Sequence, residues 1–183
     1  MALLGRQELL EALAELDEEL KFLNVRGEVF IVGGAAMAIA YDTRRTTADV
    51  DAVFVPSSEV RTAASRVAER LNLEPDWLND GAKAFLPGED ENQIGVYEGK
   101  NLSVAAASPQ YLLAMKLMAS RVERDQDDIR ELYKLCGLTT AEQGLDLLVS
   151  FYPEQLILPR VQLLLQEMFP AGHEKDRETG MSR

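Results

Sequence analysis

Cysteine and histidine are nearly absent from this chain of 183 residues, which contains one of each. The single cysteine, Cys136, excludes an intrachain disulfide and favours a reducing cytoplasm as the location. The single histidine, His173, lies in a polar C-terminal stretch, which excludes histidine-based triads and histidine-rich metal sites. Cys136 therefore has no histidine to activate it, and we interpret it as an inert thiol on a buried helix face.

Long apolar runs and an excess of positive charge are also missing. No apolar stretch approaches the roughly 20 residues that cross a bilayer, and Glu and Gln interrupt the N-terminal leucines, unlike in a secretory signal. Acidic residues number 31 against 19 basic ones, a net charge of −12 that disfavours non-specific binding to DNA. The phosphate-binding motif of P-loop proteins is absent as well.

The pattern of apolar residues predicts an α+β first part. Apolar residues recur at helical spacing over residues 7–22 and 59–71, and residues 35–41 are small and apolar, which suits a helix packed closely against a sheet. Short β-rich runs occupy four other stretches, residues 28–32, 50–55, 93–97 and 102–106. Residues 72–90, which contain the only tryptophan, show no clear pattern.

After Ser108 and Pro109 the pattern is helical throughout. Helices are expected over residues 111–120, 125–136, 140–150 and 158–169. We therefore predict a small mixed β-sheet with flanking helices, followed by a C-terminal helical bundle. The expected domains are residues 1–107 and 108–170, with a flexible tail over 171–183.

Two short motifs in the first part point to related chemistry, the pair Gly33-Gly34 and the run Thr47-Ala48-Asp49-Val50-Asp51. Alternate residues of a strand share a face, so the two aspartates are expected about 6.6 Å apart, which is two strand rises. Mg²⁺ binds such a carboxylate pair together with phosphate oxygens and waters. The glycines follow a strand and open a helix, where backbone N–H groups favour phosphate. Taken alone, the glycine pair is more often simple close packing, and the aspartate pair is more often a solvated strand edge or turn.

Together these motifs resemble the signature of the DNA-polymerase-β-like nucleotidyltransferase superfamily, and most closely the compact bacterial enzymes that include the AbiEii and MenT toxins. The likeness covers residues 29–54, and the spacer of fourteen residues between Gly34 and Asp49 lies at the long end of the pattern. It implies that Gly33, Gly34 and Thr47 bind the triphosphate of a nucleoside triphosphate (NTP). It also implies that Asp49 and Asp51 are catalytic and hold two Mg²⁺ ions.

A second, weaker resemblance covers residues 112–129, where those proteins place a helical lysine and then an Arg-Asp-x-x-Asp element. Here these are Lys116 and the run from Arg124 through Asp125 to Asp128. The resemblance implies that Lys116 contacts the triphosphate and takes part in catalysis, with Arg124, Asp125 and Asp128 nearby. The residues also allow a plainer interpretation, in which Lys116 is solvated and Asp125 is a helix N-cap.

Members of the superfamily normally supply a third carboxylate from a later strand. The stretch expected to provide it, residues 102–106, contains no acid. Glu98, Asp80 and Asp128 are the candidates to replace it.

The leading hypothesis is a bacterial, Mg²⁺-dependent nucleotidyltransferase. It would move a nucleoside monophosphate from an NTP to a hydroxyl on RNA, protein or a small molecule, and the resemblance implies a cognate toxin or antitoxin partner. The alternative is a weak or inactive protein of the same fold that binds a nucleotide or a partner, as an antitoxin does. A purely structural α+β domain would leave the coincidence of the two motifs unexplained.

Overall fold

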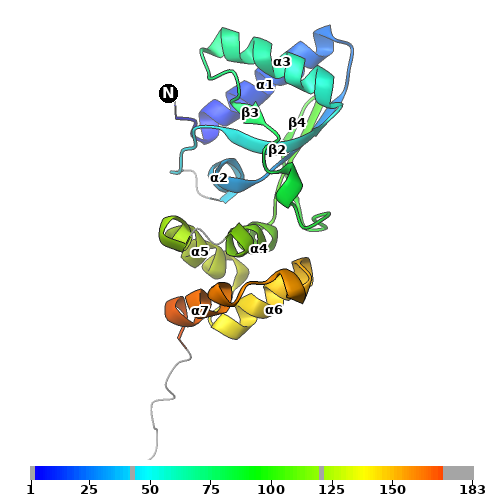
Figure 1. The fold of residues 1–183 in the computed structure, drawn as a ribbon. Helices are drawn as coiled ribbons and strands as arrows, with labels where there is room; N and C mark the ends of the chain where they lie inside the picture. Colours follow the sequence, from blue (N-terminus) through cyan, green and yellow to red (C-terminus); the bar gives the residue numbers. More distant parts are fainter. Residues whose placement is uncertain (1–2, 42–43, 120–121, 171–183) are drawn as a thin grey trace, which may run out of the picture. The chain divides into compact units, whose positions relative to one another are not determined.

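The structure is a computed structural model that describes residues 3–41, 44–119 and 122–170 (Figure 1). The chain divides into two compact units, Met1–Met115 and Lys116–Arg183, and each is described by itself. The domain boundaries expected after residues 107 and 170 stay predictions. The expected tail, with His173, lies outside the described residues.

The first unit is built on a mixed five-stranded sheet, which confirms the predicted α+β class. Its strands are β1 (Gly27–Ile31), β2 (Val50–Val55), β3 (Leu78–Asn79), β4 (Ile94–Glu98) and β5 (Leu102–Ala106). The strand order is β3-β2-β1-β5-β4, with β1 antiparallel to β2 and parallel to β5. The strand that leads into the glycine pair is therefore central, and β2, which carries Asp51, is its neighbour.

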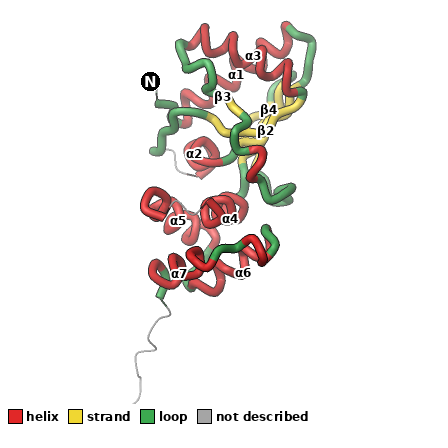
Figure 2. The backbone as a smooth tube through the Cα atoms, viewed as in Figure 1, coloured by secondary structure: helices red, strands yellow, loops and turns green. Residues whose placement is uncertain are grey.

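Two helices, α1 (Arg6–Phe22) and α3 (Ser57–Leu71), cover one face of this sheet (Figures 1 and 2). Both reach Gly27 of β1, where an added Cβ would lie 2.8 Å from Leu20 Cδ1 and 3.2 Å from Val60 Cγ2. Alternate strand residues are buried beneath these helices, among them Val29, Ile31, Val50, Ala52, Phe54, Leu102 and Val104. Burial of this apolar layer drives the folding of the first unit.

The opposite face of the sheet is more open. Phe30, Asp51, Val53, Ser103 and Ala105 are half-buried there. Helix α4 (Pro109–Ala119) covers part of this face, because the buried Tyr111 ring meets Phe30 edge-on with centroids 5.5 Å apart. Asp51 thus projects from the side of the sheet that α1 and α3 leave uncovered.

Irregular elements complete the first unit. The helix predicted over residues 35–41 begins two residues earlier, as α2 (Gly33–Ala36), and continues as the π-helix η1 (Met37–Tyr41). The stretch without a clear pattern contains β3 and the 3₁₀-helix η2 (Lys83–Phe85). Trp77 anchors this stretch, since its buried indole N–H donates to the carbonyl of Ala64 on α3 at 2.9 Å.

The second unit contains the end of α4 and the helices α5 (Val122–Cys136), α6 (Ala141–Phe151) and α7 (Pro159–Met168), with the 3₁₀-helix η3 (Glu154–Leu156) before α7. Gly137 ends α5 with a φ of +68°. Thr140 caps α6 by accepting a hydrogen bond from the Gln143 N–H. In the core, the Tyr133 ring stacks on Phe169 with centroids 3.7 Å apart.

Tyr133 and Gly144 give a stability prediction for this unit. An added Cβ at Gly144 would lie 1.7 Å from the Tyr133 hydroxyl oxygen, and the stacked ring has little room to move. Gly144→Ala should therefore lower the free energy of unfolding by roughly 1–3 kcal/mol, as overpacking does. Among the described residues the Tyr133 hydroxyl finds no hydrogen-bond partner. Removing it in Tyr133→Phe should raise stability by about 1 kcal/mol.

Urea unfolding of both variants and of the double variant tests this contact. Because Tyr133→Phe removes the atom that the alanine meets first, it should recover part of the loss in Gly144→Ala. Strictly additive effects of the two substitutions would contradict the contact.

Candidate functional site

The two glycines form the turn from β1 into α2. Gly33 has a φ of +64°, a left-handed conformation that glycine adopts without strain. Gly34 is exposed, and an added Cβ there would lie 3.2 Å from the Thr47 hydroxyl oxygen. The N-cap residue Val32 offers no side-chain hydrogen bond to the first N–H groups of the helix. These N–H groups can therefore donate to an external anion.

Asp51 lies between this turn and a second glycine turn. An added Cβ at Gly33 would lie 3.4 Å from Asp51 Oδ2, and one at Gly81 would lie 4.0 Å from Asp51 Oδ1. The Asp51 carbonyl accepts a hydrogen bond from the Val32 N–H at 2.9 Å, which fixes β2 beside the glycine turn. Asn79 pairs with Asp51 across β2 and β3. The structure thus brings Gly33, Gly34 and Asp51 together.

The sequence analysis did not include Asn79 and Gly81 in the site. The Asn79 side-chain oxygen accepts a hydrogen bond from the Gly81 N–H at 2.9 Å and so shapes the turn beside Asp51. The Asn-Asp-Gly run is a recognisable turn signal. The pairing of β3 with β2, which carries that turn to Asp51, is visible only in the structure.

Asp49 lies outside β2, so strand alternation does not fix the direction of its carboxylate relative to that of Asp51. It is exposed and lies in a bend before β2, which begins at Val50. The Thr47 hydroxyl donates to the Asp49 carbonyl at 2.9 Å, and the Thr47 backbone pairs with Leu4 through hydrogen bonds of 2.7 and 2.9 Å. The chain therefore bends at Asp49 before the strand begins, and the placing of its carboxylate beside that of Asp51 stays a prediction.

A third carboxylate is missing from the strand where the resemblance places it. Strand β5 runs parallel to β1 and presents Ala105 on the open face, and the buried Ala107, just after the strand, donates its N–H to the Ile31 carbonyl at 2.9 Å. Ala105 stands opposite Phe30 in the register of the two strands. Among the described residues, no three of His, Cys, Asp and Glu gather as metal ligands would.

The two candidate replacements in the first unit are engaged elsewhere. Glu98 lies on the edge strand β4, three strands from β2, where it accepts hydrogen bonds from Ser103 at 2.7 Å and Arg26 at 2.6 Å. These two bonds, chiefly the one from Ser103, lower the pKa of Glu98. Asp80 follows β3 and pairs with Arg61 at 3.0 Å. Asp80 is the nearer of the two to Asp51 along the sheet.

Lys116, Asp125 and Asp128 come together in the second unit. Lys116 Nζ lies 2.9 Å from Asp125 Oδ1 and 2.6 Å from Asp128 Oδ2, and only 18% of the Lys116 side chain is exposed. The plainer interpretation of these residues was wrong, because Lys116 is ion-paired and Asp125 lies inside α5, three residues after its start. Contact of Lys116 with a triphosphate stays a prediction. The side chain of Arg124 lies outside the described part of the chain.

Comparison with known protein families gives one match. Residues 9–143 match the family model described as "Nucleotidyltransferase of unknown function (DUF6036)". The matched region includes the glycine turn, both aspartates and the Lys116 cluster. No curated protein and no solved structure matches the chain significantly. Within the described ranges, no helix is long and apolar enough to cross a membrane.

The Lys116 cluster leads to a stability prediction. Lys116→Met should lower the free energy of unfolding by about 1.5–3 kcal/mol, because two half-buried carboxylates lose their shared cation. Lys134→Met is the matched control, since Lys134 is 75% exposed in its pair with Glu131, and should change stability by less than about 1 kcal/mol. Equal losses in urea unfolding would show that the Lys116 cluster is no stronger than a surface pair.

Cys136 leads to a prediction about pH. It is half-buried, and burial raises the pKa of its thiol to about 11. Its alkylation at pH 8 should therefore be at least about tenfold slower in the native protein than in urea. Because the pKa is raised on folding, the contribution of this thiol to stability is complete below the unfolded pKa and is lost as pH rises towards 11. Equal alkylation rates in the folded and unfolded protein would contradict this.

Proposed function

The chain belongs to the nucleotidyltransferase family that matches residues 9–143, and from this membership we propose that it moves a nucleoside monophosphate from an NTP to a hydroxyl acceptor with Mg²⁺. One observation carries the proposal: the Asp51 carboxylate lies 3.4 Å from the Cβ position of Gly33, at the start of a helix. A triphosphate bound to the helix N–H groups would lie beside this carboxylate. Two anionic groups in contact require a cation.

Each residue around the glycine turn and Asp51 has a distinct role in the proposal. The N–H groups of Gly33 and Gly34 bind triphosphate oxygens, and the Thr47 hydroxyl, 3.2 Å from the Gly34 Cβ position, borders the same space. Asp51 and Asp49 hold the metal. Mg²⁺ bound with the triphosphate would neutralise phosphate charge and make the α-phosphorus a better electrophile. Lys116 remains proposed as a further phosphate contact.

The donor set fits Mg²⁺, which proteins commonly hold through one or two carboxylates together with substrate phosphates. A second ion would need another carboxylate, because the strand where the resemblance places the third acid, residues 102–106, contains none. Asp80 is the candidate in the first unit, with its side chain 35% exposed. Asp128 is the candidate in the second unit.

The absence of an acid from residues 102–106 favours a second candidate function. A nucleotide-binding protein with little or no transferase activity needs the glycine turn and Asp51 but no third acid. It would act as a regulator that binds an NTP or a protein partner. The cytoplasmic toxin–antitoxin role, as either toxin or antitoxin, is proposed from the resemblance alone.

A transfer assay tests the proposed activity. Each of the four NTPs, labelled at the α-phosphate, is incubated with the protein, Mg²⁺ and bacterial RNA or protein. We expect label in the acceptor from at least one NTP, and a loss of roughly 100-fold or more in Asp51→Asn and Asp49→Asn. The matched control is Asp76→Asn, an exposed aspartate in a turn, which should keep full activity.

Thermal unfolding with Mg²⁺ and NTP separates the two candidate functions. Both predict a higher melting temperature with ligand, which Asp51→Asn abolishes, because ligand binding stabilises the folded state. Binding without transfer would support the regulator. If neither nucleotide binding nor transfer is found, both the transferase and the nucleotide-binding regulator are wrong.

A further inference from the structure

The loop that joins β3 to β4 lies on the open face of the sheet, away from α1 and α3 (Figure 1). At its start, the Cβ position of Gly81 lies 4.0 Å from Asp51 Oδ1. Further along, the Gly88 carbonyl accepts a hydrogen bond of 2.8 Å from the hydroxyl of Tyr111 on α4, which covers part of the same face. At its end, Gln93 lines a shallow hollow over the open-face residues of β1, β2 and β5. The β3–β4 loop therefore borders the side of the sheet to which Asp51 projects.

Lys83 lies in this loop two residues after Gly81, at the start of η2. The intervening turn is tight, because the Lys83 N–H donates to the Asp80 carbonyl at 3.1 Å. The Asp80 side chain pairs with Arg61 of α3, the helix on the opposite face, at 3.0 Å. Two residues span at most about 7 Å, and a lysine adds a flexible four-carbon stem. The Lys83 ammonium can therefore reach a phosphate held beside Asp51.

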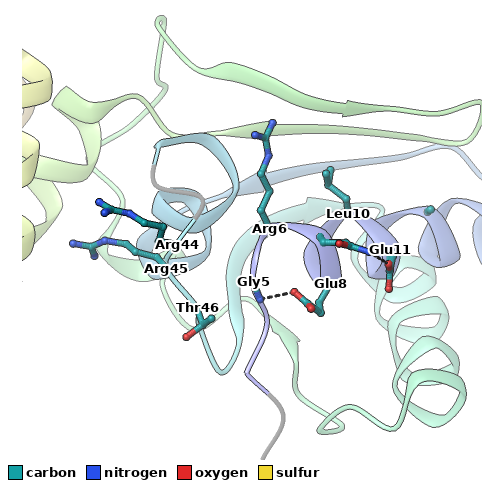
Figure 3. Close-up of a pocket in the computed structure, with 10 residues that line it drawn as sticks. Gly5, Arg6, Glu8, Leu10, Glu11, Arg44, Arg45 and Thr46 are labelled. Carbon is teal, nitrogen blue, oxygen red and sulfur yellow. Dashed lines mark hydrogen bonds between the residues drawn. The ribbon is translucent and has the colours of Figure 1, made fainter.

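The Lys83 ammonium has no competing partner in the described part of the chain. Lys83 is exposed, and no hydrogen bond or ion pair joins its side chain to another described residue. Arg44 and Arg45, which precede the two aspartates in the sequence, do have interaction partners, and their side chains extend away from Arg6 (Figure 3). Lys83 thus brings an unpaired positive charge to the loop beside Asp51.

The proposed nucleotide site needs such a charge. Mg²⁺ at Asp51 and the helix N–H groups neutralise only part of the charge of a triphosphate, and β5 contains no acid to hold a second ion. The two turns beside Asp51 face different oxygens of its carboxylate, since the Cβ position of Gly33 lies 3.4 Å from Oδ2 and that of Gly81 lies nearest Oδ1. A cation that follows Gly81 would therefore approach the triphosphate from the side that the glycine turn does not occupy.

We infer that Lys83 binds the triphosphate of the NTP on the side of Asp51 away from Gly33, an inference that rests on the proposed nucleotide site. Lysine binds phosphate as a compact point charge with three hydrogen-bond donors. The triphosphate then lies between the N–H groups of α2 and the Lys83 ammonium. Positive charge fixed beside a phosphoryl group also stabilises the charge that develops during its transfer.

Equilibrium binding of inorganic triphosphate with Mg²⁺ to the full-length protein tests the inference. This probe has no base or sugar, so its affinity reports the phosphate contacts alone. We expect Lys83→Gln to weaken binding by about tenfold, the effect of one charge-assisted hydrogen bond. Lys83→Arg keeps the charge and should bind within about threefold of the wild type.

Lys100→Gln is the matched control, because it makes the same charge change at an exposed lysine of the same unit. Lys100 lies before β5 begins, at the end of the sheet away from the glycine turn, since Leu102 of β5 pairs with Gly27 at the start of β1. This variant should bind triphosphate as the wild type does. Without ligand, the melting temperature of Lys83→Gln should equal that of the wild type, which separates phosphate binding from a structural role.

Two results would overturn the inference: Lys83→Gln binding as tightly as Lys100→Gln, or Lys83→Arg binding as weakly as Lys83→Gln. If Asp51→Asn abolishes binding while Lys83→Gln does not weaken it, the proposed metal site stands and only the part of Lys83 is wrong. Binding that depends on Lys83, with no transfer from any NTP, would support the inference and refute the transferase. Absence of binding by the wild type would refute both.

Discussion

The hydrogen bond from the Val32 N–H to the Asp51 carbonyl, 2.9 Å long, is the interaction on which the candidate site depends. It extends the antiparallel pairing of β1 and β2 to the point where β1 ends in the glycine turn. Helices α1 and α3 bury the apolar side of both strands and hold this pairing rigid. The opposite side is left for the Asp51 carboxylate, which therefore meets the first turn of α2.

The chemistry that the site can perform follows from the charged and polar groups around the Gly33-Gly34 turn and Asp51. Helix N–H groups and a carboxylate in contact favour an anion that carries its own cation, as a triphosphate with Mg²⁺ does. The sheet limits the proposed chemistry as well, because β5, the strand expected to supply a third carboxylate, contains no acid. A catalytic protein must then find its remaining groups outside β5, whereas a nucleotide-binding regulator needs none.

Local signals predicted much of the fold and part of the site. Apolar alternation located β2 to the residue, and the neighbourhood of Gly33 and Asp51 followed from strand, turn and helix signals. The bend at Asp49 was not predicted, and the pairing of the nearby Thr47 with Leu4, a residue distant in the sequence, is visible only in the structure. The place of Gly81 beside Asp51 and the ion pairs of Lys116 were missed for the same reason: their partners are brought close only by tertiary folding.

The most direct measurement of the central claim is a crystal structure with Mg²⁺ and an NTP analogue that cannot be cleaved between the α- and β-phosphates. The account predicts triphosphate oxygens on the N–H groups of Gly33 and Gly34, with the metal between them and the Asp51 carboxylate. A nucleotide bound elsewhere, or a triphosphate at the glycine turn with no metal on Asp51, would contradict it.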